Sequence, residues 1–111
     1  MPHCIIEHSS SIEPVDLNKK VFLGALESNL FEPNGGDIKV RSIAYEHYLT
    51  GSSKGSFIHV TLRILSGRSE QDKLLLSNSV MSKLKSIQLA SASLTVEVVD
   101  IDRNSYAKQI V

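Results

Sequence analysis

The chain has 111 residues, of which 41% are hydrophobic and 22% charged, as is typical of one soluble globular domain. Twelve Lys and Arg residues balance twelve Asp and Glu residues, so no overall field favours nucleic acid or a membrane surface as a partner. The single cysteine, Cys4, excludes an internal disulfide framework and fits a reducing compartment. With neither a leader pattern nor a long apolar run, the sequence predicts a cytoplasmic protein.

The first fifty residues are predicted to form a strand, a helix and a second strand. Ile5 and Ile6 are adjacent apolar residues within residues 3–8, as expected of a strand covered on both faces. Apolar residues spaced three and four apart predict a helix over about residues 15–31. Turn-forming residues follow, and alternation then predicts a strand over residues 38–49. The helix positions near one face are Leu17, Val21, Ala25 and Leu30.

The second half repeats this plan. Residues 50–56 predict a hairpin-type connection to a strand over residues 57–65, where apolar and polar residues alternate. Ser69 is a suitable N-cap for a second helix, because its hydroxyl can accept a backbone N–H of the first turn. A last strand is predicted over residues 94–101, followed by a polar tail, residues 102–111. The apolar stripe of the second helix is Leu76, Val80, Leu84 and Ile87.

The predicted fold is α+β, with two layers and one domain spanning residues 1–111. Its two β-α-β units, about residues 2–50 and 56–101, should form a four-stranded sheet with both helices on one face. The other face would then be bare, and its apolar residues are too many to leave in water. Association through this face is therefore expected. These apolar residues include Ile43, Tyr45 and Phe57.

Pro2 is a candidate catalytic residue. If Met1 is removed, Pro2 becomes the amino terminus and carries a secondary amine at the start of the first strand. Such an amine can act as a general base when its surroundings hold its pKa near neutral. A proline at position 2 is also a common processing feature, so Pro2 alone is a weak signal.

Two segments stand out, Pro2-His3-x-Ile5-x-Glu7 and Phe57-x-His59-x-Thr61-Leu62-x-Ile64-x-x-Gly67-Arg68. With the duplicated plan, they resemble the 5-carboxymethyl-2-hydroxymuconate delta-isomerase family of the tautomerase superfamily. The resemblance implies a tautomerase-like homotrimer with active sites near subunit boundaries and without a metal or nucleotide cofactor. It implies that Pro2 moves a proton along an unsaturated 2-hydroxy polycarboxylate, in the catabolism of homoprotocatechuate.

The resemblance also implies cationic residues that bind the substrate carboxylates. Arg68 matches one family arginine, while the second strand has Lys39 and Arg41 where the family has two arginines. A lysine keeps the charge but lacks the bidentate fork of a guanidinium. Without the family, Arg68 would be a solvated turn residue. Lys39 and Arg41, two residues apart on one strand face, would then be a charged edge that opposes aggregation.

The remaining reactive side chains suggest no second chemistry. The four histidines lack metal-ligand spacing, although the expected hairpin would bring His47 and His59 near each other. Cys4 is better explained as a small core residue than as a nucleophile. The rival to catalysis is a non-catalytic trimeric binding or scaffold protein with the same fold. A retained Met1 would favour it, because Pro2 would then be a tertiary amide.

Overall fold

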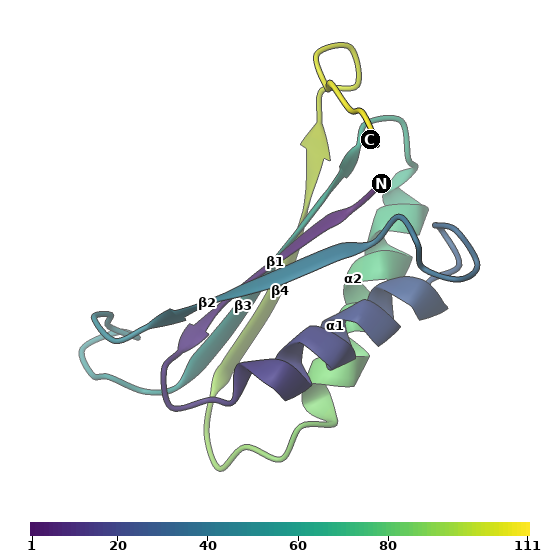
Figure 1. Ribbon diagram of the computed structural model, residues 1–111. Coiled ribbons are helices and arrows are strands. Elements are labelled where there is room, and N and C mark those ends of the chain that lie inside the picture. Colours follow the sequence, from purple (N-terminus) through teal and green to yellow (C-terminus); the bar gives the residue numbers. More distant parts are fainter.

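Two β-α-β units follow one another along the chain (Figure 1). The computed structural model describes residues 1–111 apart from the side chain of Val15. Among the described residues, neither helix has the length and apolar character needed to span a bilayer. The elements are β1 (His3–Ser9), α1 (Pro14–Glu27), β2 (Lys39–Tyr45), β3 (Phe57–Leu65), α2 (Glu70–Lys85) and β4 (Ser93–Ile101).

The four strands form one mixed sheet in the order β2-β1-β3-β4. β1 is parallel to β2 and antiparallel to β3, and β3 is parallel to β4. Both helices cover the same face, as Figure 1 shows, so the expected two-layer α+β fold is confirmed. The expected hairpin between the second and third strands is wrong, because β1 lies between them. Residues 46–56 instead connect the edge strand β2 to the central strand β3.

The core lies between the helices and the sheet. β1 and β3 occupy the centre of the sheet, and their helix-facing side chains are almost completely buried. The Ser69 cap is confirmed, since its Oγ accepts the N–H of Asp72 at 3.1 Å. The buried apolar residues are Cys4, Ile6, Ile12, Leu17, Val21, Ala25, Ile58, Val60, Leu62, Ile64, Leu76, Val80 and Leu84.

The first helix ends earlier than its apolar pattern predicts. It stops at Glu27, and Asn29 then adopts a left-handed conformation with φ of 60°. Asn tolerates this conformation better than most residues, so the chain can leave the helix axis here. Leu30 and Phe31 still pack against the core, but from the loop. Their spacing in the sequence matches that of one more helical turn, and the predicted helix is therefore too long.

The sheet face opposite the helices is bare, as expected, but it is more polar than expected. The Tyr45 hydroxyl donates to Glu7 Oε2 at 2.6 Å, and this bond and the carboxylate charge raise the pKa of Tyr45. His59 Nε2 lies 2.5 Å from Glu97 Oε2. Ile43 is half exposed among these groups. A partner on this face must therefore satisfy polar pairs as well as cover apolar side chains.

The two helices touch at Gly24. A Cβ at this position would lie 2.7 Å from the Cα of Val80, and Ser79 Oγ already donates to the Gly24 carbonyl at 2.6 Å. Gly24→Ala should therefore lower the free energy of unfolding by about 1–3 kcal/mol, although alanine has the better helix propensity. Urea denaturation measures this. Asn78→Ala, on the exposed side of α2, should stay within about 0.5 kcal/mol of the wild type, and an unchanged or more stable Gly24→Ala variant would contradict the tight contact.

Candidate active site

Pro2 is fixed at the start of β1. Its side chain is fully buried on the helix side of the sheet, and its carbonyl accepts the N–H of Lys39 at 3.1 Å. This bond extends the parallel pairing of β1 and β2 by one step. Backbone pairing and side-chain burial together therefore hold the proline in one place.

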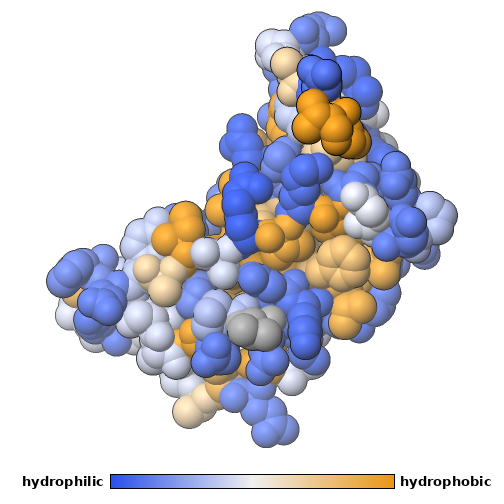
Figure 2. Space-filling model, viewed as in Figure 1, coloured by the Kyte–Doolittle hydropathy of each residue, from blue (hydrophilic) through white to orange (hydrophobic). Residues whose placement is uncertain are grey.

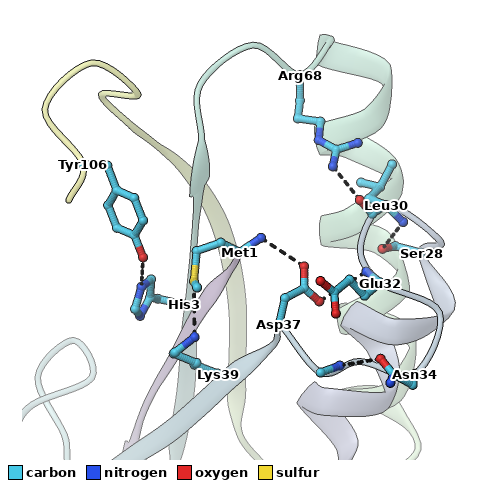
Figure 3. Close-up of polar contacts among 11 residues, drawn as sticks. Met1, His3, Ser28, Leu30, Glu32, Asn34, Asp37, Lys39, Arg68 and Tyr106 are labelled. Carbon is cyan, nitrogen blue, oxygen red and sulfur yellow. Dashed lines mark hydrogen bonds and ion pairs between the residues drawn. The ribbon is translucent and has the colours of Figure 1, made fainter. Parts of the chain in front are cut away.

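Met1 is also held (Figure 3). Its ammonium lies 3.1 Å from Asp37 Oδ2, and its side chain is only 5% exposed. Lys39 Nζ approaches the Met1 sulfur at 3.5 Å. With Met1 in place, the nitrogen of Pro2 is an amide without a basic lone pair. The chemistry available at this terminus therefore depends on whether the methionine is present.

Asp37 is a neighbour of the terminus that sequence reasoning missed. It lies at the end of the loop between α1 and β2, and its Oδ1 accepts the N–H of Glu32 at 3.2 Å. Burial alone would raise the pKa of Asp37, but the hydrogen bond and charge of the terminal ammonium and two backbone N–H groups lower it overall. An ionised carboxylate therefore faces the terminus, where sequence analysis expected only cations.

Lys39 and Arg41 share the bare face of β2, as their spacing predicts. Only Lys39 contacts the terminal residue; Arg41 Nη1 instead donates to His3 Nδ1 at 3.2 Å. Both side chains are exposed, and neither is in an ion pair among the described residues. Arg63 lies opposite His3 in the β1-β3 register. The result is a basic cluster beside the terminus.

His3 links this cluster to the C-terminal tail. A guanidinium only donates, so His3 Nδ1 must accept from Arg41, and Nε2–H then donates to the Tyr106 oxygen at 2.8 Å. Burial and then the charges of Arg41 and Lys39 lower the pKa of His3, which fits a neutral ring. The hydroxyl hydrogen of Tyr106 is left free to meet another acceptor. No motif in the tail indicated that Tyr106 would lie here.

Arg68 approaches from the opposite side of the terminus, on the loop between β3 and α2 (Figure 3). Its Nη2 donates to the Leu30 carbonyl at 2.5 Å, and its guanidinium carbon lies 5.7 Å from the Phe31 ring centre. Arg68 thus contacts two residues of the loop between α1 and β2, the same loop that contains Asp37. The structure brings Lys39 to the terminus, leaves Arg41 beside His3 and holds Arg68 on this loop.

The other reactive side chains lie apart from this site. Cys4 is fully buried, and burial raises the pKa of its thiol to about 12, so it is a core residue as expected. His47 and His59 are not brought together by a hairpin, since β2 and β3 are not neighbours. Among the described residues, no group of three His, Cys, Asp or Glu side chains is arranged to hold a metal ion.

One family model matches nearly the whole chain. The model of the 5-carboxymethyl-2-hydroxymuconate isomerase family matches residues 2–109. A crystal structure described as 5-carboxymethyl-2-hydroxymuconate delta-isomerase superposes with a TM-score of 0.77 and 18% identity, over 100% of this chain and 89% of the other. A 5-carboxymethyl-2-hydroxymuconate isomerase from Deinococcus radiodurans R1 gives a TM-score of 0.75 and 22% identity, over 97% and 88%.

A structure described as a fused 4-OT wild-type symmetric trimer gives a TM-score of 0.69 and 12% identity, over 96% of this chain and 93% of the other. A search of curated proteins found no match. At such low identities, the similar structures show a shared fold. The assignment to a family therefore rests on the match of the family model to nearly the whole chain.

Proposed function

Because this chain belongs to the 5-carboxymethyl-2-hydroxymuconate isomerase family, we propose that it is an isomerase acting on an unsaturated 2-hydroxy polycarboxylate. The family match over residues 2–109 is the observation that carries the proposal. The substrate class is that of 5-carboxymethyl-2-hydroxymuconate, and the reaction is a shift of one proton and two double bonds. It needs no metal or nucleotide, because an amine can supply both proton transfers.

In the proposed mechanism, Met1 is removed and Pro2 nitrogen is the general base and acid. The amine takes the proton of the 2-hydroxyl group, and the O–H electron pair forms the new carbonyl. The double bonds shift along the chain, and a distant carbon then takes a proton from the ammonium. The product is a 2-oxo acid, and the amine returns to its starting state. The burial and pairing that fix Pro2 support this role.

Cations near the terminus support binding of a polycarboxylate. Lys39 contacts the residue that precedes Pro2, so we propose that it binds one substrate carboxylate. Arg68 and Arg41 are proposed to bind further carboxylates from the two sides of the terminus. Arg68 must then leave the Leu30 carbonyl or use its other N–H groups. A guanidinium has five N–H donors, so both contacts can coexist.

Asp37 should raise the pKa of the Pro2 amine and so oppose the effect of these cations. An ionised carboxylate favours the protonated amine and raises its pKa, whereas burial and neighbouring cations lower it. Asp37→Asn should therefore lower the apparent pKa in the pH profile of kcat/KM by about one unit. Glu32→Gln is the matched control, because the Glu32 side chain has no bond to the terminus among the described residues. An unchanged profile in Asp37→Asn would show that Asp37 does not face the amine.

We propose that the protein assembles as a homotrimer. The bare sheet face offers the surface, and the similarity in fold to the symmetric 4-OT trimer supports the arrangement. Light scattering should give about three times the chain mass of 12.2 kDa. A mass near 12.2 kDa at micromolar concentration would contradict the trimer.

The activity is tested directly with 5-carboxymethyl-2-hydroxymuconate. Protein shown by mass spectrometry to begin at Pro2 should accelerate the loss of the dienol absorbance. Chemical acylation of the terminal amine should stop this, because it removes the basic nitrogen. If the processed protein gives only the buffer rate with this substrate and with 2-hydroxymuconate, the isomerase proposal fails.

One observation favours a second candidate, a non-catalytic trimeric binding or scaffold protein. Met1 has partners for both its ammonium and its side chain, as a permanent residue would. This candidate predicts that the protein isolated from its own cells keeps Met1 and that neither form has turnover. Mass spectrometry followed by the dienol assay distinguishes the two candidates.

A further inference from the structure

Three positive side chains form a basic cluster at the end of the bare sheet face beside the amino terminus. Lys39 on β2 and Arg63 on β3 are both Cα partners of His3, and Arg41 follows two positions after Lys39 on the same face. All three cations are exposed, and no ion pair includes any of them among the described residues. Like charges that lie close together repel, so the basic cluster should attract an anion.

The carboxylates of this face are engaged elsewhere. Glu7 accepts a hydrogen bond from the Tyr45 hydroxyl, and Glu97 is paired with a histidine. On β4, the residue opposite Arg63 is Val99, which carries no charge. Neither carboxylate is therefore free to balance the basic cluster, and an external anion is the fitting occupant.

A neutral histidine holds a hydroxyl donor beside these cations. His3 Nδ1 accepts from Arg41 at 3.2 Å, so His3 Nε2–H donates to the Tyr106 oxygen at 2.8 Å. The Tyr106 hydroxyl hydrogen remains to be donated, as do further N–H groups of Arg41. An imidazolium has no acceptor nitrogen. Burial and then the charge of Arg41 lower the pKa of His3, which preserves the bond from Arg41.

The helix side of β2 fits an anion less well. Its groove against α1 has a volume of about 500 Å³, and Figure 2 shows apolar side chains gathered over this part of the surface. A carboxylate loses hydration when it is buried and needs donors in exchange, so it should bind the basic cluster rather than the groove. The groove is lined by one cation, one amide and four apolar side chains, which are Lys19, Asn18, Phe22, Leu23, Ile38 and Val40.

The basic cluster lies within reach of a substrate at the terminus. His3 directly follows Pro2, and adjacent Cα atoms are about 3.8 Å apart. Figure 3 shows His3 and Tyr106 on one side of the terminal residue and Arg68 on the other. A substrate whose dienol lies at the Pro2 amine can therefore extend one end over the basic cluster.

We propose that Arg41, Arg63 and the Tyr106 hydroxyl bind the carboxymethyl carboxylate of the substrate. His3 is a positioning residue, since it holds Arg41 and Tyr106 and has no donor left for the ligand. This inference rests on the proposed function, whose substrate has three carboxylates. The cations at the terminus and on its other side bind two of them, and the third meets this subsite. The chain therefore selects a tricarboxylate over a dicarboxylate of the same dienol type.

Two substrates that differ in this one group test the assignment. 2-Hydroxymuconate lacks the carboxymethyl group, so the ratio of kcat/KM for the tricarboxylate to kcat/KM for the dicarboxylate reports binding of that group. Arg63→Gln should lower kcat/KM for the tricarboxylate by about tenfold, because one charged contact is lost, and for the dicarboxylate by less than about twofold. Tyr106→Phe should lower the ratio in the same direction. Lys85→Gln is the matched control, because it removes the same charge from the last turn of α2 in the other layer, and it should leave the ratio unchanged.

The positioning role of His3 needs a readout other than overall activity. His3→Leu should lower the same substrate ratio, because it loses both the acceptor for Arg41 and the donor to Tyr106. A glutamine amide can accept with its oxygen and donate with its nitrogen, so His3→Gln should recover part of the ratio. An equal loss for both substrates in His3→Leu, or no recovery in His3→Gln, would overturn the positioning role.

Binding without turnover separates this inference from the isomerase proposal. Calorimetry compares propane-1,2,3-tricarboxylate with glutarate, which has the same carbon chain but lacks the central carboxylate. The wild type should bind the tricarboxylate about tenfold more tightly, and Arg63→Gln should bind the two acids alike. Equal binding by the wild type, or weaker assembly of Arg63→Gln with an unchanged substrate ratio, would overturn the subsite. A wild type without turnover that still distinguishes the two acids would refute the isomerase proposal and support the subsite.

Discussion

Protein that keeps Met1 is expected to lose nearly all isomerase turnover, by about a thousandfold, while it folds and assembles normally. Removing a general base from a proton transfer typically costs between about a hundredfold and ten-thousandfold in rate. A retained Met1 removes the base outright, since Pro2 nitrogen becomes an amide. It also fills the space beside Asp37 and Lys39, where its side chain is 5% exposed.

The measurement needs both forms of the same chain. Cells in which methionine removal is inhibited supply the retained form, and mass spectrometry verifies each sample. Circular dichroism and light scattering should be the same for both, because Met1 precedes the first residue of β1 and is not part of the core. Pro2→Ala, which keeps a primary amine at the same place, should retain part of the activity. Equal turnover by the retained and processed forms would show that Pro2 nitrogen is not the base.

The fold was largely predictable because its main signals are local. Alternation from Phe57 to Leu65 predicted β3 with its observed bounds, and Ser69 was identified as the cap of α2. The order of strands was not predictable in this way. The second and third strands follow one another along the chain, but β1 pairs with both of them and separates them in the sheet, and such long-range pairing leaves no local pattern.

The candidate site was less predictable because its contacts span the chain. Asp37 is 36 positions from the ammonium that it binds, and Tyr106 is 103 positions from His3. In the sequence Asp37 belongs to a turn and Tyr106 to a polar tail, so neither has a local pattern that indicates a site. The three cations were identified by resemblance to the family. Their different contacts, with Met1, His3 and Leu30, are seen only in the three-dimensional structure.

Arg68 is expected to be the cation whose loss has the largest effect. Arg68→Ala should lower kcat/KM by about 10 to 100-fold, because one charged pair with a substrate carboxylate is lost. Arg68 also donates to Leu30, so the substitution could instead loosen the loop that ends in Asp37. Arg68→Lys separates the two causes. A lysine keeps a charge for the carboxylate but not the planar fork, so Arg68→Lys should recover part of the loss.

Lys39 and Arg41 on β2 provide a comparison for Arg68, because substitution of either one removes a cation without removing the bond to the Leu30 carbonyl. Lys39 contacts the terminal residue and Arg41 contacts His3, so Lys39→Ala should raise KM more than Arg41→Ala. The pH profile of kcat/KM separates the two causes further. A looser loop alone gives no reason for the apparent pKa in this profile to rise. Loss of a cation near the amine raises the amine's pKa, so the rise in kcat/KM should move to higher pH in Arg68→Ala and in Lys39→Ala. Wild-type kinetics in Arg68→Ala would remove Arg68 from the site and leave Lys39 as the principal carboxylate-binding residue.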